Sequence, residues 1–481
     1  MSETKTATKY VPTIGLEVHA ELKTKTKMFC DSPNNPDEEK PNANTCPICL
    51  GHPGTLPTLN KEAIKKVLMV GHSIDANIAD FTEWDRKNYF YPDIPKGYQI
   101  SQYKYPLISG GKIGDVEITR IHLEEDTGTS IHDKGDYSLV NYNRAGVPLM
   151  ELVTEPVIHS AKQAGDFGRE LQLLLRYLGV SDANMEKGEM RVEANISIAK
   201  EDAKEFGTKV EVKNLNSFKI VEKAIEFEIK RMTKLMDEGR GEEIVQETRG
   251  WDEAKGKTFS QRKKESSDDY RYFPEPDLPK LKISEIPEFD AEKIKSELPE
   301  LPNQKRRKLS EVGLAENQID FLVRNMDFGK CFDEIAVEVT DQKQITLVAN
   351  YLSSDVVSIM KEDENISIDY LDRKQFIELV KMISGNEISS RGAKDILAIL
   401  MKEGGETRVI AEEKGLMQQS DTGALEEIAN KIISENESVV VDFKNGKEAA
   451  LQFLIGQGMK ETRGSANPQV LKEVFTNLIG K

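Results

Sequence analysis

The sequence has little cysteine, no long apolar segment and no excess of positive charge, and each shortage excludes a class of protein. Four cysteines in 481 residues do not make a disulfide framework, so a reducing, cytoplasmic setting is expected. No apolar run approaches the roughly 20 residues of a membrane span, and the first residues lack the apolar core of a secretory signal. Lysine and arginine total 66 against 83 acidic residues, a net charge of −17, which argues against uniform coating of nucleic acid.

Two common catalytic signatures are also missing. The sequence contains no Gly-x-x-x-x-Gly-Lys-Ser/Thr phosphate loop, and the nearest approach, from Gly250 to Thr258, has the wrong glycine spacing. It contains no serine-nucleophile elbow or Gly-Ser-rich amidase signature. A P-loop fold is therefore disfavoured, and any ammonia that the protein uses is expected to come from elsewhere.

Proline and histidine are unevenly distributed and divide the chain. All six histidines precede residue 160, and six of the 19 prolines fall between Pro274 and Pro302. Because each proline removes a backbone donor and restricts the residue before it, residues 272–302 are expected to end one domain and form a connector. The composition, 31% charged and 38% hydrophobic, is that of a globular protein, and the length predicts two to four domains.

Hydrophobic periodicity predicts the fold class α+β. Apolar residues alternate over 11–22, which predicts a strand. Apolar residues at three- and four-residue steps predict helices over 161–178 and 217–238, each ended by a glycine. Two more strands are expected, at 191–198 and 208–213. Because strands and two long helices share about the first 290 residues, this part is expected to be α+β, followed by a helical part and a small helical tail.

Acidic residues cluster at three places in the predicted strands. Glu17 and His19 share one face of the first strand, although a solvated polar face is an alternative. The carboxylates Glu124, Glu125 and Asp126 are consecutive and follow His122, so either a surface turn or a bound cation must offset their repulsion. Glu151 and Glu155 share strand parity in an apolar run, where buried carboxylates need partners.

Converging carboxylates predict a magnesium site, because Mg²⁺ prefers oxygen ligands. The basic residues Arg86, Lys87 and Arg144 could hold a triphosphate, and His19 suits an acid–base or ligand role. Acids that hold a metal and bases that hold phosphates are what phosphoryl transfer requires. The residues therefore predict a site that uses metal and nucleotide.

Three of the cysteines have a spacing typical of metal ligands. Cys46 and Cys49 form a C-x-x-C pair, and Cys30 lies upstream. His52, Asp31 or water could supply a fourth zinc ligand, and plain reduced thiols are the alternative. Cys331 stands alone in a helical region and is expected in the core.

The last part of the chain is locally basic. Residues 444–481 hold six basic and three acidic residues, and glycines lie among Lys444, Lys447, Lys460 and Arg463. Such segments can contact phosphates, although a solvated surface has the same composition.

A set of strings spanning nearly the whole chain resembles one family. The strings are Ile14-Gly-Leu-Glu-Val-His19, Asp85-Arg-Lys-Asn-Tyr-Phe-Tyr-Pro-Asp93, Tyr98-Gln-Ile-Ser-Gln102, His122-Leu-Glu-Glu-Asp126, Lys213-Asn-Leu-Asn-Ser-Phe218, Asp268-Asp-Tyr-Arg-Tyr-Phe-Pro-Glu-Pro-Asp277, and the tail from Lys444-Asn-Gly-Lys447 to Ala466-Asn-Pro468. Together they make the chain similar to GatB, the B subunit of the heterotrimeric tRNA-dependent amidotransferase GatCAB.

The resemblance implies a fold, a reaction and partners. It implies a catalytic cradle similar to glutamine synthetase and guanido kinases over 1–292, a helical domain over 293–405, and a YqeY-like tail over 406–481 that contacts tRNA. It implies that ATP and Mg²⁺ serve to phosphorylate the side-chain carboxylate of glutamate or aspartate mischarged on tRNA. Ammonia from a GatA-like amidase subunit would then displace phosphate, with a GatC-like subunit completing the heterotrimer.

The resemblance also assigns roles to the residues already singled out. The expected catalytic residues are Glu17, His19, Glu125 and Glu151, and the expected magnesium ligands are Glu17, Glu124, Glu125 and Glu151. The expected nucleotide contacts are Lys87, Arg86 and Arg144, and the expected tRNA contacts are Lys444, Lys447, Lys460 and Arg463.

The chain departs from the family at its cysteines. Zinc-containing members commonly show Cys-x-Cys before Cys-x-x-Cys, whereas this chain has Cys30-Asp-Ser32, which leaves zinc open. A stand-alone ligase of the glutamine synthetase type and a non-catalytic tRNA-binding scaffold are the alternatives. The archaeal relative GatE is disfavoured because the 280–303 connector leaves no room for its inserted domain. Whether Glu-tRNA, Asp-tRNA or both are substrates is not specified by the sequence.

Overall fold

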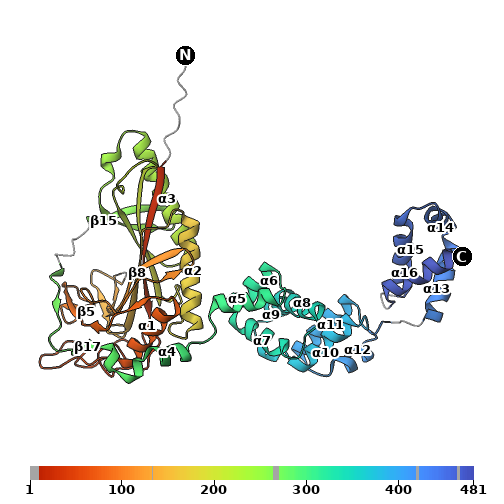
Figure 1. Ribbon diagram of the computed structural model, residues 1–481, viewed down its shortest axis with the longest axis horizontal. Coiled ribbons are helices and arrows are strands. Elements are labelled where there is room, and N and C mark those ends of the chain that lie inside the picture. Colours follow the sequence, from red (N-terminus) through yellow and green to blue (C-terminus); the bar gives the residue numbers. More distant parts are fainter. Residues whose placement is uncertain (1–9, 133, 264–269, 419–421, 463–465, 481) are drawn as a thin grey trace, which may run out of the picture. The chain divides into compact units, whose positions relative to one another are not determined.

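The computed structural model describes residues 10–132, 134–263, 270–418, 422–462 and 466–480. The chain forms two compact units, Met1–Pro302 and Asn303–Lys481 (Figure 1). The expected tRNA contact Arg463 and the string residue Asp268 lie outside the described residues. None of the described helices is long and apolar enough to cross a membrane.

A ten-stranded sheet with β1 near its centre organises the first unit. Its order is β15-β14-β13-β12-β1-β11-β8-β6-β2, and β7 pairs with β8. The pairing is antiparallel except between β13 and β14. The strands are β1 (Tyr10–Glu21), β2 (Asn77–Ile78), β6 (Ile108–Ser109), β7 (Lys112–Ile113), β8 (Val116–Glu125), β11 (Pro148–Thr154), β12 (Met190–Lys200), β13 (Val210–Leu215), β14 (Glu247–Asp252) and β15 (Lys257–Lys263).

Three helices pack against one face of this sheet: α1 (Lys61–Ser73), α2 (Ala161–Tyr177) and α3 (Phe218–Asp237). Their N-termini are capped by Asn60, Ser160 and Ser217, whose side chains accept backbone N–H bonds. The chain leaves α2 and α3 through Gly179 (φ +64°) and Gly239 (φ +72°), because glycine adopts the left-handed conformation without strain. The two helices expected from periodicity are thereby confirmed.

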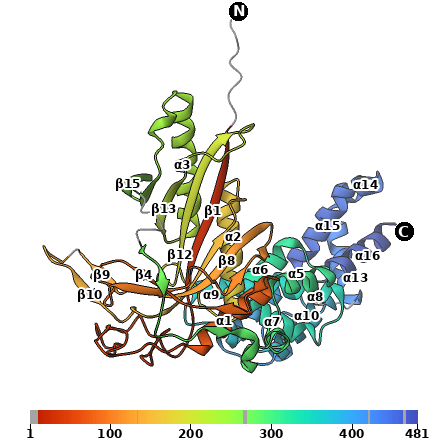
Figure 2. The same cartoon turned by 60° about the vertical axis from the view of Figure 1, so that its left-hand side comes forward.

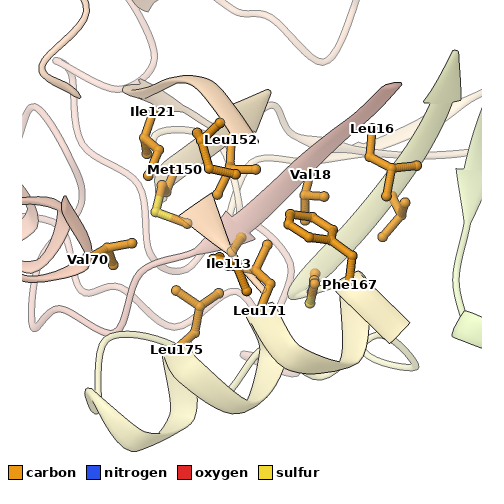
Figure 3. Close-up of a cluster of buried hydrophobic side chains, with 14 of the residues drawn as sticks. Leu16, Val18, Val70, Ile113, Ile121, Met150, Leu152, Phe167, Leu171 and Leu175 are labelled. Carbon is orange, nitrogen blue, oxygen red and sulfur yellow. The ribbon is translucent and has the colours of Figure 1, made fainter. Parts of the chain in front are cut away.

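The covered face of β1 is apolar and its opposite face is polar. Leu16 and Val18 of β1 lie against Phe167 and Leu171 of α2 in a continuous buried core (Figure 3). Since successive strand residues point to opposite sides, Glu17 and His19 face away from these helices. In Figure 2 the hairpin of β9 (Thr129–Ile131) and β10 (Leu139–Asn141) extends to the left of the long strands, whereas α2 lies to their right.

Short strands and the proline-rich stretch complete the first unit. They are β3 (Phe81–Thr82), β4 (Asp85–Asn88), β5 (Tyr98–Ser101), β16 (Phe273–Pro274) and β17 (Leu281–Lys282), followed by 3₁₀ turns and α4 (Ala291–Glu297). β16 pairs with β4, and β17 pairs with β3. Phe289 and Ile294 are buried in the main core. The stretch expected to connect domains therefore packs on the first unit, because prolines are tolerated in short edge strands.

The second unit consists of helices over its described residues. They are α5 (Pro302–Glu311), α6 (Glu316–Arg324), α7 (Met326–Ala336), α8 (Gln342–Tyr351), a π-helical turn (Leu352–Val356), α9 (Val357–Glu362), α10 (Arg373–Ser384), α11 (Ser390–Lys402), α12 (Thr407–Glu413), α13 (Thr422–Glu435), α14 (Glu437–Lys444), α15 (Glu448–Glu461) and α16 (Pro468–Ile479).

Two groups of helices can be distinguished within this unit. Thr407 at the start of α12 donates its hydroxyl to the Gln375 carbonyl of α10 (2.7 Å). Leu425, Leu454 and Phe475 belong to a separate hydrophobic cluster of α13, α15 and α16. Cys331 is fully buried, as expected. The large sheet with many helices confirms the α+β class, whereas the three-part division at 292 and 405 stays a prediction.

Candidate functional site

The register of four neighbouring strands brings the polar side chains together. His19 of β1 lies opposite Glu151 of β11, and Glu151 lies opposite His122 of β8. On the other side of β1, Glu17 lies opposite Glu193 of β12. Directly opposed residues of paired strands share a face, so these side chains gather on the polar face, away from α2.

One group, which we call the histidine subsite, comprises Glu17, His19, His122, Glu124 and Glu151. His19 Nε2 lies 3.4 Å from Glu151 Oε2 and 3.6 Å from Glu124 Oε1. His122 Nε2 also lies 3.4 Å from Glu151 Oε2. Glu124 and Glu151 are buried. The ligand atoms form two overlapping groups, one of Glu17, His19 and Glu151 and one of His122, Glu124 and Glu151, and within each group they lie within 4.8 Å of one another. Such carboxylate and imidazole donors can hold a divalent cation.

Burial and like charges shift the protonation of this subsite. Burial, followed by repulsion from Glu151 and Glu193, raises the pKa of Glu17 to about 7. Burial lowers the pKa of His19, but its bond to Glu151 and the charge of Glu124 outweigh that and raise the pKa to about 9. Added protons therefore compensate for the crowded carboxylates, and a bound cation would do the same.

A second group, the carboxylate subsite, comprises Glu17, Glu193 and Glu211, with oxygens within 4.8 Å of one another. Thr248 donates its hydroxyl to Glu211 Oε2 (2.8 Å), and Lys213 Nζ lies 2.8 Å from Glu193 Oε2. Glu17 is shared with the histidine subsite. Two adjoining groups of potential cation ligands that share a carboxylate would be an arrangement suited to phosphoryl chemistry.

Glu193 and Glu211 are not among the site residues predicted from the sequence. A local signal existed, because both are acidic residues in strand segments (190–200 and 210–215) whose apolar residues alternate with polar ones. Their meeting with Glu17 depends on the β12–β1 and β12–β13 pairings, which no local pattern specifies.

Glu125 does not join the histidine subsite, contrary to expectation. It points to the other side of β8, where its carboxylate pairs with Lys96 Nζ (2.7 Å) and accepts the Ile100 backbone N–H (2.9 Å). Adjacent Glu124 and Glu125 must point to opposite faces of a strand. Glu155 is also apart from the cluster and accepts the Thr119 hydroxyl (2.7 Å).

The structure separates the three expected basic residues. Lys87 lines a large cleft on the polar face. Burial lowers its pKa, but the nearby Glu124 charge and others raise that pKa well above its usual value. Arg86 makes two bonds to Glu275 (2.7 and 2.8 Å), and Arg144 donates to the Thr127 and Gly128 carbonyls (3.0 Å each). These two arginines hold loops, so Lys87 alone of the three expected residues lines the cleft.

The cleft beside the two subsites has polar and aromatic walls. Besides Lys87 it is lined by Glu193, Lys213, Thr248, Tyr270 and Arg271. At its margin Phe90 is 85% exposed and Tyr91 is 59% exposed. A cleft of this kind accommodates a large substrate with both aromatic and anionic parts.

Three thiols meet elsewhere in the first unit. The sulfurs of Cys30, Cys46 and Cys49 lie within 4.8 Å of one another. Ser32 Oγ lies 3.9 Å from Cys49 Sγ, and the fully buried Lys27 places Nζ 4.0 Å from the same sulfur. These donors fit zinc, because three thiolates with Zn²⁺ carry one net negative charge that the ammonium would offset.

The other fourth-ligand candidates are less well placed. Asp31 and His52 are exposed and do not belong to the group of mutually close ligand atoms. Ser32 is buried beside Cys49, so its hydroxyl or a water that it holds is the better fourth donor.

The expected tRNA contacts of the tail are described in part. Lys444, Lys447 and Lys460 are exposed, and Lys447 pairs with Asp442 (2.9 Å).

Known proteins resemble the chain over nearly its whole length. Residues 12–287 match the family model described as the GatB/GatE catalytic domain, and residues 330–479 match the one described as the GatB domain. The chain is 44% identical to the B subunit of the aspartyl/glutamyl-tRNA(Asn/Gln) amidotransferase of Thermoanaerobacter pseudethanolicus, over 98% of this chain and all of that protein. It is 42% identical to the protein of the same name from a Picosynechococcus strain, over 97% of each chain.

A plant protein also aligns with most of the chain. The B subunit of the glutamyl-tRNA(Gln) amidotransferase of Sorghum bicolor, named as chloroplastic/mitochondrial, is 42% identical over 96% of this chain and 86% of its own length.

Proposed function

Since the chain belongs to the GatB family of tRNA-dependent amidotransferase subunits, we propose that its polar cleft phosphorylates a carboxylate esterified to tRNA. The chain is the B subunit of an aspartyl/glutamyl-tRNA amidotransferase, a ligase that forms a C–N bond with nitrogen from glutamine. The substrate is the side chain of glutamate on tRNA(Gln), of aspartate on tRNA(Asn), or of both.

The chemistry explains why ATP is required. A carboxylate is a poor electrophile, because its charge and resonance oppose attack by an amine. Transfer of the γ-phosphoryl group forms a bond from phosphorus to a carboxylate oxygen and breaks the bond to ADP. Ammonia then attacks the carbonyl carbon, phosphate leaves, and the amide remains. Each half of the reaction needs negative charge to be neutralised.

The single observation that carries the proposal is the meeting of carboxylates from β1, β8, β11, β12 and β13 beside one cleft. When bound, Mg²⁺ would neutralise charge on the transferred phosphoryl group. Glu17, Glu151 and Glu124 would hold one ion, and Glu17, Glu193 and Glu211 a second. Lys87 presents a cation to the same cleft, while His19 and His122 orient Glu151 through contacts of 3.4 Å.

A chain of small cavities supports delivery of ammonia to this cleft. One cavity lies between the thiol cluster and the Lys96–Glu125 ion pair. It shares Lys96 and Glu125 with a smaller cavity that also contacts Asp93 and Thr127, and these last two residues line the cleft. We therefore assign Glu125 to the ammonia route rather than to metal binding.

Partners follow from the role of a B subunit. The names of the relatives imply further subunits, and we propose a GatA-like amidase that releases ammonia and a GatC-like small subunit, assembled in the cytoplasm. We also propose that the tail contacts tRNA through exposed Lys444 and Lys460. A free small-molecule ligase would not need this tail, which disfavours the stand-alone alternative.

One reaction tests the function. The chain, assembled with its partner subunits, is supplied with ATP, Mg²⁺, ammonium and either Glu-tRNA(Gln) or Asp-tRNA(Asn). We expect ADP and amidated aminoacyl-tRNA in equal amounts from at least one of the two. Amidation of free glutamate without tRNA would favour the stand-alone ligase, and tRNA binding without ADP formation would favour the scaffold.

Zinc content tests the thiol cluster. Purified wild-type protein is expected to contain about one zinc per chain, and Ser32→Cys is expected to tighten zinc binding by supplying a fourth thiolate. The readout is metal analysis after dialysis against a graded chelator, with Cys331→Ser as the control because Cys331 lies outside the cluster. Clearly substoichiometric zinc in the wild type would instead indicate plain reduced thiols.

A further inference from the structure

Two residues of the cleft wall have an unusual backbone conformation. Arg271 (φ +47°) and Asn214 (φ +58°) both adopt the left-handed region, and both line the cleft. A side chain with a Cβ seldom adopts this conformation, which persists where surrounding contacts impose it.

The contacts that impose it on Arg271 come from Asn88. The Asn88 side-chain amide donates to the Arg271 carbonyl (2.9 Å) and to the Tyr270 carbonyl (3.3 Å). Asn88 follows Lys87 directly on β4. Beyond Arg271, pairing of Phe273 with Arg86 joins the same segment to β4. The backbone of Arg271 is thus held against the strand that carries Lys87.

The Arg271 side chain is available to a ligand. It is exposed in the cleft and makes no ion pair or hydrogen bond with any residue that the structure describes. Every other described arginine side chain of the first unit has a partner: Arg86, Arg120, Arg144, Arg169, Arg176, Arg191, Arg231, Arg240 and Arg249.

The other described cations that line the cleft lie near carboxylates. Lys213 pairs with Glu193 at 2.8 Å, and the charges of Glu124 and Glu151 act on Lys87. An anionic ligand that enters this acidic cleft therefore meets one guanidinium that pairs with no carboxylate among the described residues. Guanidinium is planar and donates two parallel N–H bonds, a geometry that matches phosphate oxygens.

We propose that Arg271 binds the γ-phosphoryl group of ATP during its transfer, and that Asn88 is the positioning residue that aims it. The inference rests on the function proposed above. In the step, the bond from the γ-phosphorus to the bridging oxygen of ADP breaks, and a bond to the substrate carboxylate oxygen forms. Arg271 donates N–H bonds to non-bridging oxygens, and no proton leaves it.

The test uses the complete complex with ATP, saturating ammonium and misacylated tRNA, and measures ADP and amidated product. Arg271→Ala is expected to lower kcat by about 100-fold or more. Arg271→Lys is expected to recover less than a tenth of that loss, because a lysine ammonium lacks the two parallel N–H donors of a guanidinium. Millimolar guanidinium is expected to restore part of the Arg271→Ala activity. A merely structural role would not respond to guanidinium.

Asn88 is tested by a double-mutant cycle. Asn88→Ala is expected to lower kcat by about tenfold alone and to add little in the Arg271→Ala background, because residues that act through one another are not additive. Arg240→Ala is the control, since Arg240 is exposed and pairs with Glu243 outside the cleft.

Defined outcomes overturn the inference. Wild-type kcat in Arg271→Ala would reject it. A loss confined to tRNA affinity would indicate a contact to an RNA phosphodiester instead. Additive effects of the two substitutions would reject the positioning role. Absence of ADP formation by the wild-type complex would reject the proposed function itself, which keeps the two failures distinct.

Discussion

Replacement of Glu151 by glutamine is expected to abolish phosphorylation of the tRNA-linked carboxylate, with a fall in rate of about 1,000-fold or more. The Glu151 carboxylate lies 3.4 Å from both His19 Nε2 and His122 Nε2 and belongs to two groups of potential metal ligands. Glutamine keeps the size but removes the charge. A metal contribution of several kcal/mol, at about 1.4 kcal/mol per tenfold, corresponds to this loss.

The measurement is ADP formation by the complete complex with misacylated tRNA. Glutamine hydrolysis by the partner subunit should remain measurable, because that chemistry lies elsewhere. Glu155→Gln is the matched control: Glu155 lies just beyond the same strand but bonds Thr119 outside the subsite, so its rate should stay near that of the wild type. Full amidation by the Glu151→Gln complex would count decisively against the histidine subsite.

Glu211→Gln is expected to lower the same rate by about 100-fold at moderate Mg²⁺, with partial recovery as Mg²⁺ is raised. Glu211 shares the carboxylate subsite with Glu17 and Glu193. Loss of one negative charge there is expected to weaken binding of the second Mg²⁺ and to leave the histidine subsite unchanged. The amide oxygen can still accept the Thr248 hydroxyl bond that Glu211 Oε2 accepts at 2.8 Å, which preserves the local fold.

A magnesium titration separates this effect from unfolding. The half-saturating Mg²⁺ concentration should rise in Glu211→Gln, whereas Glu253→Gln, in the exposed turn between β14 and β15, should titrate like the wild type. An unchanged magnesium dependence in Glu211→Gln would show that this group of carboxylates does not hold an ion that the reaction uses.

The acidic residues 124–126 illustrate which features of the site a local sequence pattern can predict and which it cannot. The resemblance places Glu124 and Glu125 both at the metal, whereas the residues alone leave a surface turn as the alternative for the three consecutive carboxylates. Strand alternation instead directs Glu124 to the histidine subsite and Glu125 to Lys96, while Asp126 accepts bonds from Arg191 (3.0 Å). The sequence shows that adjacent strand residues point to opposite faces, but it does not show which residues each face contacts.

The basic residues show a similar limit. Arg86 and Lys87 are adjacent and both basic, so the sequence predicts both of them as phosphate ligands. In the fold, Arg86 is engaged by Glu275, a residue far along the chain, and Lys87 points into the cleft. Glu275 lies in the same segment, 268–277, as Arg271. Neither the pairing of Glu275 with Arg86 nor the position of Arg271 in the cleft could be predicted from periodicity.

The family, the α+β class, and the helices over 161–178 and 217–238 could be predicted from the residues alone, because they depend on characteristic strings, local periodicity and end signals such as Gly179 and Gly239. The same local pattern predicts Glu17 and His19 on one face of a strand. Which carboxylates meet could not be predicted in this way, since Glu17, Glu151 and Glu193 become neighbours through strand pairing across more than a hundred residues. Register between distant strands is set by the packing of the whole core, and that information is not local.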